Sequence, residues 1–351
     1  MSPAARVIVV GARGFIGKKI MTAVTRLATS RAIDQPVELV PASRGGDFAL
    51  DLSVPETFEK LRAGDIVVDA SSSAAAEPDL LAKACIEKGA TLLITSSDRS
   101  LVERLMTTFR EVSGPGRLVL GAGIFTGASN VLAQAAARAL PGATSLELAV
   151  SSSPFSGAGE GTVDLMVDSL AMPTRRVEDG QWVDAPSVSA GPLVVFPAAA
   201  RKTLEVPLAE PAMVAASTNT PNVRMFFAPK PGLLRASFLI LPSALRRLGT
   251  FRWFMKQYFS LLRRVFLRRV ASAVEIVAIA RKGPEEASAS LSVSDGMEAL
   301  GVSIAATIEI LTQRAPREGT VFIDEFVDAG ELRATMARLG PPSLRQDWRL
   351  P

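Results

Sequence analysis

The sequence contains no histidine and only one cysteine, Cys85. The absence of histidine excludes Ser-His-Asp and Cys-His nucleophilic catalysis in their usual forms, as well as any histidine-based metal site. A single cysteine cannot form an internal disulfide or a zinc cluster, and it is typical of a reducing compartment. We therefore expect no metal, and chemistry that depends on a cofactor, carboxylates, lysines, hydroxyls or the one tyrosine, Tyr258.

Acidic residues are missing from one long segment. Between Pro211 and Val274 the chain has no Asp or Glu but has eleven Lys and Arg residues. The net charge of +4 therefore hides a basic segment inside a chain that is otherwise net acidic. The eleven basic residues are Arg224, Lys230, Arg235, Arg246, Arg247, Arg252, Lys256, Arg263, Arg264, Arg268 and Arg269.

Long uncharged apolar runs are also absent. None approaches the roughly 20 residues that a membrane-spanning helix needs, and the chain enters an apolar strand at Val7 without the charged start of a secretory signal. We therefore expect a cytoplasmic protein, and the basic segment adds peripheral contact with a membrane to that expectation. With 351 residues, 48% of them hydrophobic, the chain is long enough for two domains.

The first 140 residues alternate between short apolar runs and amphipathic stretches. The apolar runs show no polar alternation, which is typical of parallel strands covered on both faces. This order predicts an α/β fold with a Rossmann doubly wound parallel sheet. The predicted strands cover 6–10, 37–42, 65–70, 91–95 and 117–123.

The pattern changes after about residue 144. Residues 144–153 alternate, and 272–294 contain two alternating runs joined by a Gly-Pro turn. We therefore predict a second α+β domain at 141–296 with a mixed or antiparallel sheet. Two helical stretches, 296–315 and 329–340, follow it.

Three glycines, Gly11, Gly14 and Gly17, follow the first predicted strand and open a helix. In a strand–turn–helix of this kind the glycines allow a tight turn, close approach of phosphates and close helix packing, while the helix N-terminus faces a pyrophosphate. The context predicts dinucleotide binding; the alternative is a turn that only packs the helix. The predicted cofactor residues are Gly11, Arg13, Gly14, Phe15, Ile16, Gly17, Ser43, Arg44, Asp51, Ala70, Ser71 and Ser72.

The end of the second predicted strand indicates which of the two nucleotides, NAD or NADP(H), the chain binds. An NAD site is expected to have an acidic residue there, whereas this strand ends in Ser43 and Arg44. An arginine at this position suits the 2′-phosphate of NADP(H), and Arg13 is expected beside the adenine or the same phosphate. The alternative is that Arg44 is a solvated loop residue. We predict NADP(H) as the cofactor.

An ordered series of motifs resembles the saccharopine dehydrogenase-like family. The resemblance is good over 6–140, thinner to about 170, and only architectural beyond. It implies NADPH-dependent reduction of imines or related unsaturated substrates, a nucleotide domain of 1–140 completed by 297–351, and a homodimer through the sheet of the second domain. The motifs are "GARGFIG", "SR", "DLSVPETFEKL", "DIVVDASSS", "LLAKACIEKGATLLITSSD", "GAGIFTGASNVLA" and "SGAGEGTVDLMVDSL".

Catalytic residues are harder to predict. The Tyr-x-x-x-Lys pair of short-chain dehydrogenases is absent, because Leu262 stands four residues after Tyr258. The resembled family often has Tyr-x-Asp where this chain has Leu92 and Ile94. The remaining polar candidates are Asp98, Lys83 and Tyr258, each with a structural or surface role as the alternative. Hydride transfer to a protonated iminium needs little acid catalysis, since the cofactor carries the chemistry.

The segment 232–270 predicts a basic amphipathic helix with an aromatic face. Such a helix suits an anionic membrane surface, an acidic carrier protein or the cover of an apolar substrate channel; the alternative is an ordinary helix with a core face and solvated arginines. Nucleic acid is not expected, because no recognition motif accompanies the charge. The face comprises Phe251, Phe254, Met255, Tyr258, Leu262, Val265 and Phe266.

Two functions remain open from the sequence. The first is an NADPH-dependent reductase acting on a C=N or C=C bond of an apolar or lipid-linked substrate. The second is a catalytically silent nucleotide-binding scaffold that binds a membrane or a partner protein through the basic helix.

Overall fold

The computed structural model describes residues 5–30, 36–71, 78–153, 167–168, 172–240, 249–262 and 272–351. The chain divides into two compact units, each made of two segments. The first unit contains Met1–Ala128 and Met297–Ser343, and the second contains Ser129–Gly296 and Leu344–Pro351.

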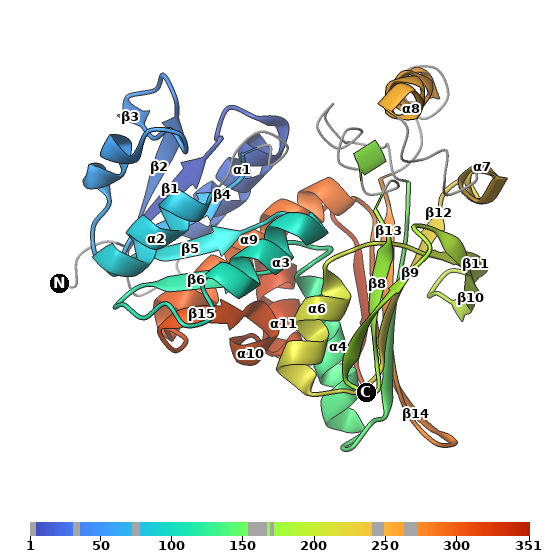
Figure 1. Cartoon of the computed structure of the whole chain (residues 1–351). Helices are drawn as coiled ribbons and strands as arrows, with labels where there is room; N and C mark the ends of the chain where they lie inside the picture. The colour runs from blue at the N-terminus through green and yellow to red at the C-terminus, as the bar shows by residue number, and fades with distance from the viewer. Residues whose placement is uncertain are drawn as a thin grey trace. The chain divides into compact units, whose positions relative to one another are not determined.

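The first unit is built on a seven-stranded parallel sheet with the order β15-β6-β5-β4-β1-β2-β3 (Figure 1). The chain runs outward from β1 in one direction through β2 and β3, and in the other through β4, β5, β6 and β15. The reversal lies between β1 and β4, the point where doubly wound sheets bind ligands. The predicted fold class is confirmed. The strands are β1 (Ala5–Val10), β2 (Val37–Ser43), β3 (Phe48–Ala49), β4 (Ile66–Asp69), β5 (Thr91–Ile94), β6 (Arg117–Leu120) and β15 (Gly319–Phe322).

Helices cover both faces of this sheet (Figure 1). Helix α1 packs so closely on α9 that a Cβ at Gly301 would lie 2.7 Å from the carbonyl oxygen of Lys19. Glu298 of α9 accepts hydrogen bonds from Lys19 and Arg26 of α1, which lower the pKa of its carboxyl although burial opposes them. The helices are α1 (Phe15–Thr29), the 3₁₀ helix η1 (Pro55–Lys60), α2 (Asp79–Lys88), α3 (Arg99–Thr108), α9 (Gly296–Gln313), α10 (Ile323–Phe326) and α11 (Ala329–Leu339).

The second unit contains a mixed nine-stranded sheet. Seven of its strands follow the order β10-β11-β12-β7-β13-β14-β16; the other two are β8, which pairs with β12, and β9, which pairs with β8. β12 and β7 are parallel, and the other pairs are antiparallel. Helices α4 (Ala128–Ala139) and α6 (Glu210–Thr218) lie together beside this sheet (Figure 1). The strands are β7 (Ser145–Ser152), β8 (Thr174–Glu178), β9 (Gln181–Ala185), β10 (Ser189–Val195), β11 (Ala200–Glu205), β12 (Val223–Pro229), β13 (Val274–Lys282), β14 (Glu285–Val293) and β16 (Gln346–Arg349).

The unit boundaries differ from the expected domains at two places. The second unit begins at Ser129 rather than after residue 140, because α4 leads directly into β7. Residues 344–351 were expected to complete the nucleotide domain, but β16 pairs with β14 and extends the second sheet. The glycine-rich stretch 156–170 lies outside the described residues apart from Val167 and Asp168.

A buried carboxylate, Glu275, lies at the start of β13 with only 2% of its side chain exposed. Its oxygens accept hydrogen bonds from Lys230 Nζ at 2.5 Å, from the Ala198 backbone N–H at 2.8 Å and from Arg201 Nη2 at 3.4 Å. Burial by itself raises the pKa of Glu275, but the Lys230 bond and these other partners outweigh it and hold the pKa below its ordinary value. The carboxylate is therefore ionised and joins three strand ends.

A second buried carboxyl, Glu210, lies at the first turn of α6 and has no exposed surface. Its Oε1 is 3.5 Å from the hydroxyl of Ser129, and within the described structure its Oε2 has no hydrogen-bond partner. Burial raises the pKa of Glu210 to about 7, which the hydrogen bonds oppose only in part. Unlike Glu275, this group has no cation beside it in the described structure.

No helix in the described ranges is both long and apolar enough to cross a membrane.

Candidate nucleotide-binding site

The turn between β1 and α1 is fixed by backbone contacts that only glycine permits. Gly11 has a φ of +77°, and a Cβ there would lie 2.9 Å from the carbonyl oxygen of Ala70. At Gly17 a Cβ would lie 2.1 Å from the carbonyl oxygen of Gly11, so α1 presses directly on the turn. The Gly14 N–H donates to that same Gly11 oxygen at 2.8 Å. Gly11 and Gly17 are therefore required by the geometry, whereas a Cβ at Gly14 would lie 3.1 Å from the Gly11 carbonyl oxygen and would need only a small adjustment.

The N-terminus of α1 is open to an anion. Gly14 is its N-cap and offers no side-chain oxygen to the first-turn N–H groups, and no acidic residue stands in that turn. Phe15 is 48% exposed beside it, and Ile16 is half-buried. Free N–H groups and the positive end of a helix dipole together favour a phosphate. The turn thus combines the space and the donors that a pyrophosphate needs.

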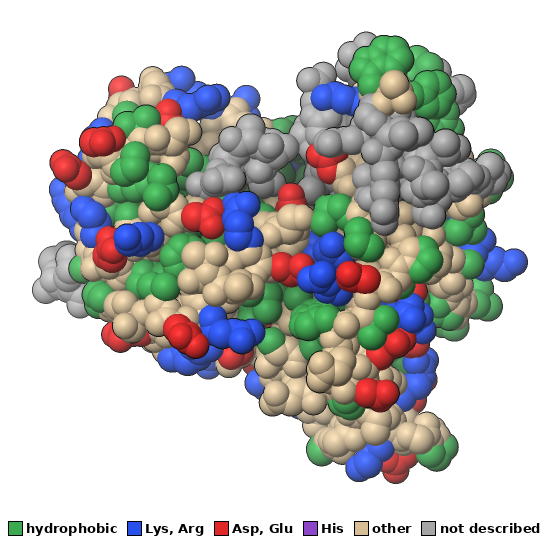
Figure 2. Space-filling view, in the orientation of Figure 1, with side chains coloured by type: hydrophobic (Ala, Val, Ile, Leu, Met, Phe, Trp, Pro, Cys, Tyr) green, Lys and Arg blue, Asp and Glu red, His purple; other side chains and the backbone are tan. Residues whose placement is uncertain are grey.

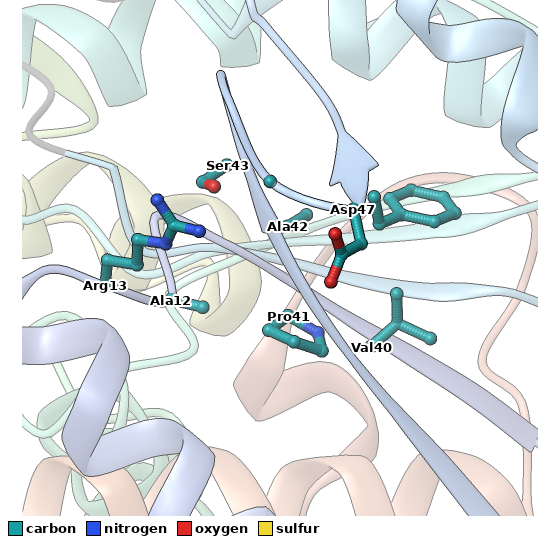
Figure 3. A pocket seen from close by; sticks show the side chains of 9 residues that line it. Ala12, Arg13, Val40, Pro41, Ala42, Ser43 and Asp47 are labelled. Atoms are coloured by element: carbon teal, nitrogen blue, oxygen red, sulfur yellow. The ribbon is translucent and has the colours of Figure 1, made fainter.

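Beside this turn is a pocket of about 230 Å³ at the end of β2 (Figure 3). Pockets that enclose a whole drug-sized ligand are roughly 300–1,000 Å³, so this one accommodates one portion of a dinucleotide. In Figure 3 the Arg13 guanidinium is directed toward Ser43, and the Asp47 carboxylate lies on the other side of Ala42. The lining residues are Ala12, Arg13, Val40, Pro41, Ala42, Ser43, Gly46, Asp47 and Phe48.

The loop after β2 brings Asp47, to which the sequence pattern assigned no role, to this pocket. After Ser43 the chain turns back to form β3, pairing Ala42 with Phe48 and Ser43 with Ala49. Arg44 and Asp47 are both exposed, and of the two Asp47 lines the pocket; the contact of Arg44 with a cofactor stays a prediction. Arg13 supplies the pocket's guanidinium instead. Asp47 is a functional candidate that the sequence pattern missed, because a two-residue strand gives no recognisable signal.

The loop after β4 forms the other wall of the glycine turn. Ala70 is buried against Gly11, and Ser71 donates from both its N–H and its hydroxyl to Asp69 Oδ1, at 3.0 and 2.6 Å. Burial raises the pKa of Asp69, and the two Ser71 bonds oppose that shift. Asp69 therefore holds the loop in shape from beneath. Ser72 lies outside the described residues.

Asp51 has a local structural contact in this region. Its Oδ1 accepts from the Ser53 N–H at 3.0 Å, and its backbone N–H lies 3.1 Å from the Thr57 hydroxyl of η1. Asp51 shapes the turn that leads from β3 into η1, and its contact with a cofactor stays a prediction.

The three candidate catalytic residues are not brought together within either unit. Asp98 is the N-cap of α3 and accepts from the N–H groups of Ser100 and Leu101. Lys83 is 65% exposed and pairs with Glu87 one helical turn away. Tyr258 belongs to the second unit. A catalytic role for any of them remains a prediction.

No protein-family model matches the chain, and no curated protein matches its sequence. Solved structures with a similar arrangement include dehydrogenases and a reductase. The DAP dehydrogenase of C. glutamicum in complex with DAP is 11% identical, with 95% of this chain and 96% of that chain covered and a TM-score of 0.46.

Two further structures are equally distant. An engineered D-amino acid dehydrogenase bound to NADP⁺ is 12% identical over 94% of this chain and 96% of that chain, with a TM-score of 0.46. An amine dehydrogenase from Mycobacterium smegmatis is 10% identical over 93% and 97%, with a TM-score of 0.42. Likenesses this weak carry no argument about function.

Proposed function

We propose that this chain is an NADP(H)-dependent oxidoreductase that reduces a C=N or C=C bond. The observation that carries the proposal is the glycine turn at the N-terminus of α1, placed at the reversal of strand order and beside the pocket that contains Arg13. Bound NADPH supplies the hydride. The protein residues bind and orient the nucleotide: Gly11, Gly14 and Gly17 admit the pyrophosphate, and the loop at Ala70 supports the turn.

The pocket supports a preference for NADPH over NADH through Arg13 and Ser43. A guanidinium and a hydroxyl both donate to phosphate oxygens, and an Arg–phosphate contact is charge-assisted. Asp47 acts in the opposite direction, because its carboxylate repels a 2′-phosphate and accepts a hydrogen bond from a 2′-hydroxyl. The preference is therefore a balance between Arg13 and Asp47 across one pocket, with Arg44 contributing only long-range attraction from its exposed position.

The proposed substrate class follows from the lack of a clear proton donor among the candidate residues of this chain. A chain without histidine, whose Asp98 and Lys83 already have structural partners, suits a substrate that needs little proton transfer, such as an iminium. An apolar or lipid-linked substrate agrees with the exposed aromatic side chains of the second unit described below. The saccharopine dehydrogenase-like family remains the assignment that the motifs favour.

Nucleotide titration tests the proposal. NADPH and NADH affinities are measured by fluorescence at moderate salt on the wild type, Arg13→Ala and Asp47→Asn. We expect Arg13→Ala to weaken NADPH about tenfold or more, since a charged hydrogen bond is worth about 1.5–3 kcal/mol, and to leave NADH nearly unchanged. Asp47→Asn should shift the balance further toward NADPH.

Arg44→Ala is the matched control, because it removes the same charge from an exposed residue that directly follows Ser43, the last residue of β2, and that does not line the pocket. It should weaken NADPH less than Arg13→Ala does. Failure of the wild type to bind either nucleotide would overturn the proposal. Equal losses in the two arginine variants would instead assign the 2′-phosphate to general attraction rather than to the pocket.

The nucleotide-binding scaffold is the second candidate, and the structural roles of Asp98 and Lys83 favour it. The two functions separate in a turnover assay with cyclic imines and α,β-unsaturated carbonyl compounds. If the protein binds NADPH but does not oxidise it in the presence of any of these substrates, it behaves as the scaffold. NADPH oxidation that Gly17→Ala abolishes supports the enzyme.

A further inference from the structure

Helix α8 (Gly249–Leu262) is apolar on two faces rather than one. On one face Met255 and Phe259 are buried in a cluster with Phe238 of α7 (Leu234–Ile240), whose ring centroid is 5.7 Å from that of Phe259. Tyr258 packs against the edge of this cluster. This face attaches α8 to the second unit.

The other face of α8 is exposed. Trp253 is 66% exposed, Phe254 58% and Leu261 59%, so three large apolar side chains of one helix lie in solvent. Trp253 and Leu261 are eight residues apart, about two turns, and Phe254 lies on the same side. Phe254 was expected on the same buried face as Met255, but it is exposed and its ring stacks on that of Tyr258, with the centroids 6.4 Å apart. Figure 2 shows hydrophobic side chains gathered at α8.

The basic residues of this segment are concentrated, along the sequence, within and on either side of α8. Three of the eleven basic residues are bonded elsewhere in the second unit: Arg224 to Glu205, Lys230 to Glu275 and Arg235 to the carbonyl oxygen of Thr203. The remaining eight fall between Arg246 and Arg269, a stretch without any acidic residue. Among these eight, Lys256 of α8 is described and exposed.

This charge decides between the occupants that an apolar face could have. A second copy of the chain docking through the same face would bring two such basic stretches together, because a two-fold interface pairs identical surfaces. Like charges at that contact are repulsive. An anionic surface is complementary to them, and tryptophan with aliphatic neighbours suits the boundary between headgroups and acyl chains.

We propose that the exposed face of α8 docks the second unit onto an anionic lipid surface, with Trp253, Phe254 and Leu261 entering the headgroup boundary. The docking is peripheral, since α8 has 14 residues and its other face is committed to the protein. It is independent of the nucleotide site, and either proposal can fail without the other.

Vesicle co-sedimentation of the full chain tests the docking. The vesicles are phosphatidylcholine alone or with about one third phosphatidylserine, at low and at physiological salt. We expect binding to the anionic vesicles that weakens with salt. The triple variant Trp253→Ser/Phe254→Ser/Leu261→Ser should lower the partition coefficient about tenfold or more. The control Leu193→Ser/Val195→Ser removes two equally exposed apolar residues, 63% and 73% exposed on β10, and should not change it.

A spectroscopic arm reports on insertion directly. In a Trp182→Phe/Trp348→Phe background, Trp253 is the remaining tryptophan. Its emission should shift to the blue when anionic vesicles are added, because the indole leaves water. Urea unfolding of the triple variant, followed by the fluorescence of Trp182 and Trp348 in the second unit, should match that of wild type and so confirms that the variant folds.

Three results would overturn the docking. One is no binding of the wild type to anionic vesicles at low salt. Another is an equal loss in the triple variant and the β10 control. A third is concentration-dependent dimerisation that the triple variant abolishes, which would make a second copy the occupant of the face.

Discussion

The two units fix their strand-end loops in opposite ways. In the first unit the β1–α1 turn is held by backbone against backbone, with Gly17 seated on Gly11 and Gly11 on Ala70. In the second unit the ends of β12 and β13 are held by charge, with Glu275 bonded to Lys230 and to its neighbours. The first site is therefore sensitive to any added atom, whereas the second is sensitive to any lost charge.

The chain provides a separate natural probe for each unit. Its only cysteine, Cys85, is buried in the first unit, and all three tryptophans, Trp182, Trp253 and Trp348, belong to the second. Thiol labelling therefore follows the opening of the first unit, and tryptophan fluorescence follows the second.

The largest effect is expected from Gly17→Ala. The new Cβ would lie 2.1 Å from the Gly11 carbonyl oxygen, a backbone atom that cannot move without displacing β1 or α1. We expect a loss of about 3 kcal/mol in the free energy of unfolding, at the upper end of overpacking costs, together with loss of nucleotide binding. Urea unfolding followed by Cys85 labelling measures it. Gly45→Ala, where nothing lies within 4 Å of the added Cβ, should change neither quantity.

A loss of similar or slightly smaller size is expected from Glu275→Gln. Removing the carboxylate charge leaves Lys230 and Arg201 facing each other in a buried site, and breaking a buried pair costs about 3 kcal/mol. Tryptophan fluorescence in urea measures the change. The control is Glu286→Gln, an ion-pair partner of Arg281 that is 51% exposed; it should cost no more than about 0.5 kcal/mol.

Glu210 should make the stability of the second unit depend on pH. Its folded-state pKa of about 7 lies above the ordinary 4.5, so the folded chain keeps a proton that the unfolded chain releases. The stabilisation is complete below pH 4.5 and is lost as the pH rises to about 7. We expect wild type to lose about 2–3 kcal/mol relative to Glu210→Gln between pH 4.5 and 8. Identical pH profiles for the two proteins would mean that Glu210 is ionised in the folded state.

The smallest effect is expected on the first unit when the second unit is destabilised. Burial raises the pKa of the Cys85 thiol, which keeps it protonated and unreactive in the native state. Under conditions where Glu275→Gln shifts tryptophan fluorescence, the rate of Cys85 labelling should stay within about twofold of wild type if local opening is independent. A parallel rise in labelling would show that the units open together.

The sequence was sufficient where one local pattern determines the structure. The five predicted apolar strands of the first sheet are present, as are the β1–α1 turn and the β13–β14 hairpin. Apolar runs and closely packed glycines predict their structure locally, because burial on both faces of a sheet and close approach of backbone to backbone allow few other conformations.

The remainder depends on partners far away in the chain. β8 and β9 contain Arg175, Arg176 and Asp184 and show no clear alternation, and they become strands by pairing with each other and with β12. The sequence of the basic segment does not show that Lys230 is paired, since its partner Glu275 lies 45 residues later in the chain. Asp47 was not predicted at the pocket, because the return of the chain into β3 has no local signal.

The interleaving of the two units constrains the order in which the chain folds during synthesis. The chain passes between the units three times. β15 covers the edge of β6 only once residue 322 has been made, and β16 extends β14 later still. A ribosome-bound chain that has emerged only to residue 140 therefore carries β6 as an unpaired edge, a template for aggregation. The sheets of both units are therefore completed only when the last part of the chain, which contains β15 and β16, has been translated.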